Sequence, residues 1–79
     1  MEKAQVVIEE LASLCISAGL EAKADAARGS MEARGRLQAY YDVLDVLKGQ
    51  SDLLGITFAD KSLAKFDPDE LLATPKKAA

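Results

Sequence analysis

The chain has 79 residues, of which 49% are apolar and 29% charged, and its net charge is −3. This length has room for one small domain, and fourteen alanines with eleven leucines favour helices over sheets. The sequence holds no histidine, no cysteine pair, no signal-peptide core and no run of eighteen apolar residues. We therefore expect an all-α, non-enzymatic, cytoplasmic protein with no cofactor, no metal and no place in a membrane.

The first apolar stretch predicts one amphipathic helix over about residues 3–28. Apolar side chains recur at alternating intervals of four and three, which is the spacing of a helix face. This stripe consists of Ala4, Ile8, Leu11, Cys15, Ala18 and Ala22. Val7 and Leu14 widen the stripe, whereas Glu9 and Glu10 fall mostly on the other side. We expect Cys15 to be a small core residue rather than a nucleophile.

Arg28-Gly29-Ser30 marks the end of this helix. Gly29 can take the positive φ that closes a helix, and Ser30 can cap the next helix through its hydroxyl. These signals predict an antiparallel helical hairpin. The alternative is a single bent helix that runs through Gly29, because a glycine costs a helix only about 1 kcal/mol.

The second helix, over about residues 31–54, has two apolar seams. One comprises Leu37, Tyr40, Leu44, Leu47, Ser51 and Leu54, and the other comprises Ala39, Val43, Val46, Gln50 and Leu53. A single neighbouring helix cannot cover both seams, so we expect two chains to pair as a four-helix bundle homodimer. The interface residues that we predict are Tyr40, Val43, Val46, Leu47 and Leu53. Tyr41 falls on the polar strip that remains outside the two seams, where we expect its ring to lie along its own helix rather than to serve as an exposed contact residue.

Gly55 ends the second helix, and a short helical arm is expected over residues 56–73. Thr57 with Asp60 resembles a capping box, and Asp67-Pro68 is a stronger helix start, with a capping residue followed by proline at the first helical position. We expect this arm to dock its apolar side chains, which are Phe58, Leu63, Phe66 and Leu71, onto the helices. Residues 1–73 then form one helical domain, and residues 74–79 form a flexible tail.

Positive charge gathers where the hairpin turns. Lys23, Arg28, Arg34 and Arg36 form a candidate basic patch, in which four bases face only two acids, Asp25 and Glu32. The patch suggests an alternative function in nucleic-acid binding. We give more weight to a solvated turn whose arginines pair with the two acids, since no aromatic side chain lies among the bases. The expected partners are a second copy of the chain and an unidentified protein, rather than nucleic acid.

The segment from Arg34 to Lys48, together with Phe66-Asp67-Pro68-Asp69-Glu70-Leu71-Leu72, resembles small helical proteins of unknown function found in phages and prophages. The resemblance covers the C-terminal half and brings no catalytic or binding residues with it. It implies a phage-related structural or accessory role.

Overall fold

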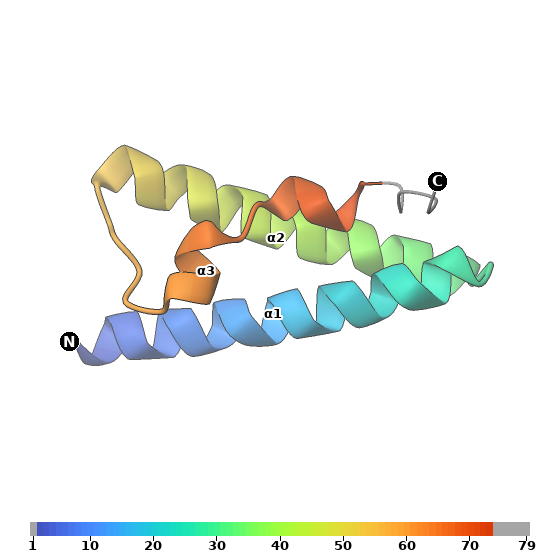
Figure 1. The fold of residues 1–79 in the computed structure, drawn as a ribbon, viewed down its shortest axis with the longest axis horizontal. Helices are drawn as coiled ribbons and strands as arrows, with labels where there is room; N and C mark the ends of the chain where they lie inside the picture. The colour runs from blue at the N-terminus through green and yellow to red at the C-terminus, as the bar shows by residue number, and fades with distance from the viewer. Residues whose placement is uncertain (1, 74–79) are drawn as a thin grey trace.

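The computed structural model describes residues 2–73 and is helical throughout, without a strand in that range. Helix α1 spans Lys3–Ala27, α2 spans Met31–Leu54, α3 spans Lys61–Lys65, and a 3-10 helix, η1, spans Pro68–Leu71. Figure 1 shows α1 and α2 running in opposite directions, close together at their turn and farther apart at the other end. The segment after α2 returns along the helix pair and fills this wedge on one side. The flexible tail predicted for residues 74–79 lies outside the described residues.

The turn between α1 and α2 follows the predicted local chemistry. Gly29 has a φ of +102°, and its N–H donates to the Ala26 carbonyl at 3.0 Å. The Ser30 hydroxyl accepts a hydrogen bond from the Ala33 N–H at 3.1 Å, so the first turn of α2 is capped. The hairpin is therefore confirmed, and the chain does not continue as one bent helix.

Helix α2 ends where the sequence predicts. Gly55 adopts the left-handed conformation with a φ of +70°, and the Ile56 N–H donates back to the Ser51 carbonyl at 2.8 Å. This hydrogen bond satisfies one of the last carbonyls of α2 and turns the chain toward α1.

Two aspartates begin the short helices of the arm. Asp60, and not Thr57, caps α3: its carboxylate accepts from the Leu63 N–H at 3.1 Å, so the predicted capping box was wrong. Asp67 accepts from the Asp69 N–H at 2.9 Å, and Pro68 follows as the first helical residue. The predicted start at Asp67 is confirmed, although the helix that it opens is a 3-10 helix of four residues.

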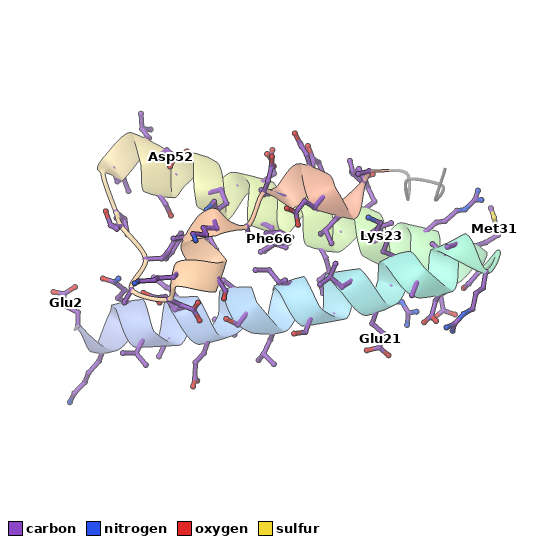
Figure 2. The ribbon with its side chains drawn as sticks, viewed as in Figure 1. Glu2, Glu21, Lys23, Met31, Asp52 and Phe66 are labelled. Carbon is purple, nitrogen blue, oxygen red and sulfur yellow. The ribbon has the colours of Figure 1, made fainter. Side chains whose placement is uncertain are left out.

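The core lies between the two long helices and the arm. Its buried apolar residues are Ala12, Ala22, Ala33, Leu44, Phe58, Leu63 and Leu71. Three of the four large side chains in this set come from the chain after α2. Phe66 is half-buried and points between the helices (Figure 2). The arm is thus docked, and it supplies most of the bulk of the core.

Helix α1 turns a different flank to the core than its apolar stripe predicts. The buried positions are Glu9, Ala12, Gly19 and Ala22. Leu11, which belongs to the predicted stripe, is 57% exposed, and Leu14, which widens it, is 66% exposed. Cys15 is half-buried and packs against the core, as expected. The predicted stripe therefore lies mostly beside the core. One of the four buried positions of α1 is instead occupied by the carboxylate of Glu9.

Candidate interaction face

The arm covers one flank of both long helices. On α1 it meets Glu9, whose carboxylate accepts from two backbone N–H groups of the arm, and on α2 it meets Tyr41 and Lys48. Lys48 donates to the carbonyls of Leu63 and Ala64 at 3.3 and 3.0 Å, which caps the end of α3 with a positive charge. The opposite flank of the helix pair receives none of these contacts.

The flank away from the arm is apolar on both helices. In α1, positions 4, 11 and 18 recur every seven residues and lie on the side of Ala12 that points away from Glu9. In α2, the corresponding side of Leu44, which points away from Tyr41, carries positions 39, 43, 46, 50 and 54. Because the helices are antiparallel, the two flanks fall on the same side of the molecule. We call this surface the apolar face, and it comprises Ala4, Val7, Leu11, Leu14, Ala18, Ala39, Val43, Val46, Gln50 and Leu54.

The apolar face is open to solvent and carries no charge. Val43, Val46 and Leu54 are 54%, 62% and 68% exposed. Gln50 is its single polar member. Charged side chains lie along its edges: Glu2 lines a groove with Ala4 and Leu54, Glu10 lies beside Leu14, and Glu21 lies beside Ala18. Near the turn Arg36 pairs with Asp25 and with Glu32, each at 3.7 Å. The arrangement is a long apolar surface with a charged rim, which is characteristic of interaction sites.

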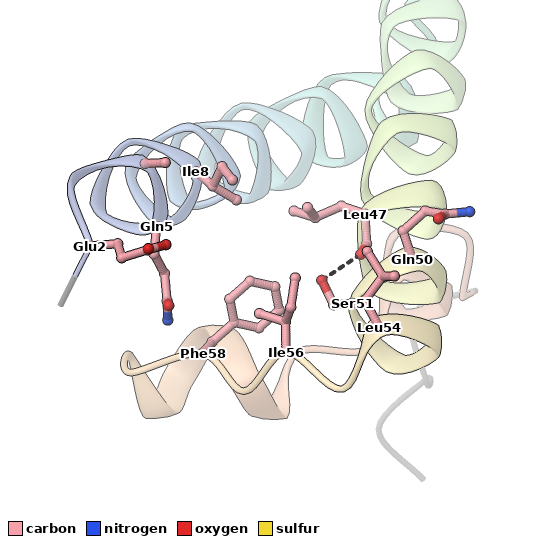
Figure 3. A pocket seen from close by; sticks show the side chains of 10 residues that line it. Glu2, Gln5, Ile8, Leu47, Gln50, Ser51, Leu54, Ile56 and Phe58 are labelled. Carbon is pink, nitrogen blue, oxygen red and sulfur yellow. Dashed lines mark hydrogen bonds between the residues drawn. The ribbon is translucent and has the colours of Figure 1, made fainter.

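A groove of about 330 Å³ opens at the end of this face where α1 and α2 diverge. It shares Ala4, Gln50 and Leu54 with the apolar face, and Ile56 and Phe58 reach it from the segment after α2. Figure 3 shows these side chains converging from α1, α2 and that segment. The hydroxyl of Ser51 donates to the Leu47 carbonyl at 2.7 Å, so this polar group in the lining is satisfied within its own helix.

The predicted interface residues fall into three groups. Val43 and Val46 lie on the apolar face. Tyr40 and Leu47 pack against the chain's own core and are half-buried, so the single chain already covers much of the seam to which they belong. Leu53 is 77% exposed and lies on the outer side of α2, opposite Leu44. The α1 half of the apolar face was not predicted from the sequence, because the apolar stripe of α1 was expected to face the core.

The residues of the predicted basic patch are mostly engaged within the chain. Arg28 pairs with Asp25 at 3.3 Å, and Arg36 pairs with the acids named above. Lys23 lies beside η1, where its ammonium donates to the Glu70 carbonyl at 2.6 Å (Figure 2). Arg34 is exposed. These contacts favour the solvated, ion-paired turn over a phosphate-binding surface.

Tyr41 does not lie free along its helix as expected. Its side chain is half-buried and its hydroxyl donates to the Asp69 carboxylate at 3.3 Å, so it holds η1. The negative charge of Asp45 and partial burial raise the pKa of the Tyr41 hydroxyl, with smaller contributions from Asp69 and Asp42. The hydroxyl therefore stays protonated and can donate at neutral pH.

Glu9 holds the segment between α2 and α3 against α1. Its carboxylate accepts from the Ala59 N–H at 3.0 Å, from the Gln5 amide at 2.8 Å and from the Asp60 N–H at 2.9 Å. The same Gln5 amide donates to the Thr57 carbonyl at 3.1 Å. These contacts fix the segment that carries Ile56 and Phe58 to the groove. In the sequence analysis Glu9 was placed outside the core because its side chain is charged. Its burial could not be foreseen, since the backbone groups that it binds lie about fifty residues away in the chain.

We expect this contact to make stability depend on pH. The hydrogen bonds from Ala59, Gln5 and Asp60 lower the pKa of Glu9, so its carboxylate stabilises the fold fully above the ordinary glutamate pKa of about 4.3. That stabilisation is lost as the pH falls through the lowered pKa of the folded state. Urea unfolding of the wild type and Glu9→Gln between neutral pH and pH 3 should show a difference in unfolding free energy that shrinks in acid.

Glu10→Gln is the matched control, since Glu10 is exposed on the same helix. A difference between wild type and Glu9→Gln that does not change with pH would contradict the role given to this carboxylate.

Comparison with known proteins finds no matching family model, no matching curated protein and no matching solved structure. Among residues 2–73, no helix is long and apolar enough to cross a membrane. The same residues bring no three potential metal-ligating side chains together.

Proposed function

We propose that this protein is a non-enzymatic helical interaction module that pairs with a second copy of itself through the apolar face, as a four-helix bundle homodimer. The observation that supports the proposal is the placement of nine apolar side chains and one glutamine on the flank that the arm leaves open. A phage-related structural or accessory role, as the sequence resemblance implies, belongs to the same proposal.

The size of the apolar face supports a protein partner. Burying a large aliphatic side chain contributes about 1.5–3 kcal/mol at about 25 cal/mol per Å², which corresponds to on the order of 100 Å² each. The six large aliphatic side chains of the face are 54–68% exposed, so together with the alanines they offer roughly 400–500 Å², which is more than half of the roughly 800 Å² per partner of a standard interface. A second copy is the proposed partner because two-fold pairing of identical chains is the commonest closed assembly, and the ten residues of the face are themselves uncharged.

The core of one chain also supports pairing. Among the described residues, seven apolar side chains are buried and three of these are alanines, whereas thirteen large apolar side chains are exposed. Small domains have little stability to spare, and pairing through the apolar face would move several of the exposed side chains out of water. The nucleic-acid alternative has less support, because the ion pairs at the turn already engage Arg28 and Arg36.

We expect Val43→Glu to raise the dimer dissociation constant at least about 30-fold, which corresponds to about 2 kcal/mol. The new carboxylate would be buried without a partner between the two copies. Sedimentation velocity over a range of micromolar concentrations measures the constant. Met31→Glu is the matched control, since it makes the same charge change at a side chain that is 74% exposed and lies off the apolar face.

Both variants should keep the far-UV circular dichroism of the wild type. An unchanged dissociation constant for Val43→Glu would show that the apolar face is not the contact surface. Equal weakening by Met31→Glu would show that net charge, and not the face, controls association.

A further inference from the structure

We infer that the arm of one copy can dock onto the helix pair of a second copy, with Gly55 as the hinge that decides between this exchange and docking within one chain. In the exchanged dimer, each chain would supply Phe58, Leu63 and Leu71 to the core of the other. The contacts that are exchanged involve none of the residues of the apolar face, so arm exchange does not depend on the proposed function.

The helix pair holds the arm largely by its backbone. Four side chains of α1 and α2 form hydrogen bonds with backbone groups of the arm, at distances of 2.6–3.3 Å. They are Gln5, Glu9, Lys23 and Lys48. None of these bonds requires that the arm belong to the same chain, so the arm of a second copy would make all of them.

The structure itself shows what covers this surface of the helix pair. Ala12 of α1 and Leu44 of α2 lie in one buried cluster with Phe58, Leu63 and Leu71 of the arm. A helix pair whose own arm has left would expose this cluster to water, which is unfavourable until an arm covers it again. An identical arm from a second copy fits the same surface.

The link between α2 and the arm has the properties of a hinge. Residues 52–57 are all exposed, and a Cβ at Gly55 would have no atom within 4 Å. In the turn, the Ile56 N–H donates to the Ser51 carbonyl, five residues back, at 2.8 Å. In a straight helix it would donate to Asp52 instead, four residues back. Straightening at Gly55 therefore replaces one hydrogen bond with another and carries the arm away from its own helix pair.

Gly55→Ala is expected to shift the protein toward arm exchange. Gly55 has a φ of +70° in the turn, where an alanine is unfavourable, whereas an alanine is more favourable than a glycine in a straight helix. The dissociation constant of the exchanged dimer should fall at least about 30-fold, which corresponds to about 2 kcal/mol. Sedimentation velocity measures this constant, with Val43→Glu added to every chain to remove pairing through the apolar face.

Two substitutions serve as controls. Gly49→Ala makes the same change at a glycine within α2 where no atom lies within 4 Å of a Cβ, and it should leave the constant unchanged. Gly55→Asn should also behave like the wild type, because asparagine tolerates the left-handed conformation.

Isotope-filtered NMR identifies the chain to which each docked arm belongs. Isotope-labelled and unlabelled copies of the Gly55→Ala chain are refolded together, and the dimer is isolated. The methyl groups of Leu71 in one chain should show nuclear Overhauser effects to Gly19 of the other, since Cδ1 of Leu71 lies 3.0 Å from the position of a Cβ at Gly19.

Three outcomes would overturn arm exchange. These are a Gly55→Ala chain that stays monomeric, one that loses its helical circular dichroism although the exchanged dimer keeps every contact of the arm, and a dimer whose contacts between Leu71 and Gly19 are all within one chain. None of them bears on the apolar face, which is tested by the effect of Val43→Glu on the wild type.

Discussion

A chain that ends at Ile56 is expected to lose cooperative thermal unfolding. The truncation removes Phe58, Leu63 and Leu71, which are three of the four large buried side chains, and leaves Leu44 facing water. Each loss of a buried leucine or phenylalanine costs about 2–5 kcal/mol, and a domain of this size has only about 5–15 kcal/mol in total. The remaining helices also lose the hydrogen bonds that Glu9, Lys48 and Tyr41 make with the arm.

Far-UV circular dichroism against temperature, at a concentration where wild type and variant are both monomeric, measures this effect. A chain that ends at Ala73 is the control, since it keeps every core residue within the described range 2–73, and it should melt like the wild type. Leu63→Ala tests the same account without a truncation, with an expected loss of about 2–4 kcal/mol. A sharp transition that survives removal of residues 57–79 would show that the hairpin is stable without its arm.

Gly19→Val is expected to displace η1 from the core. A Cβ at Gly19 would lie 3.0 Å from Cδ1 of Leu71, 3.2 Å from its Cδ2 and 3.4 Å from the Cβ of Tyr40. The two further methyl groups of valine would enter the space that Leu71 fills. Overpacking of this kind costs about 1–3 kcal/mol, which exceeds the few tenths gained by replacing a helical glycine. Urea unfolding should show the loss.

Gly49→Val is the control, because no atom lies within 4 Å of a Cβ at that helical glycine. It should leave stability unchanged or raise it slightly, since a glycine within a helix is itself unfavourable. Hydrogen exchange should show faster exchange of the Leu72 amide in Gly19→Val, because its bond to the Asp69 carbonyl forms only in the docked 3-10 helix. Equal stability of the two valine variants would contradict the close packing at Gly19.

Local chemistry made the helix boundaries predictable from the sequence. Ser30, Gly55 and Asp67 satisfy backbone groups within a few residues of themselves, so their roles need no knowledge of the rest of the fold. The docked arm was predictable for a related reason: Leu63 and Leu71 sit in or beside short helices and need an apolar surface.

The buried flank of α1 could not be predicted in the same way. This helix is apolar over more than half of its circumference, so periodicity leaves several orientations acceptable. The orientation depends on contacts with distant residues, namely the backbone of Ala59 and Asp60 at Glu9 and the side chain of Leu71 at Gly19. The apolar face is a consequence of the orientation of α1 about its axis, because in this orientation Leu11 and Leu14 lie on the surface and not in the core.

Sedimentation equilibrium of the wild-type chain shows whether a second copy covers the apolar face, as proposed. At micromolar concentrations we expect a reversible equilibrium in which the mass approaches twice the monomer mass of 8.4 kDa. A single species of 8.4 kDa at all concentrations, with cooperative unfolding that does not depend on concentration, would contradict it.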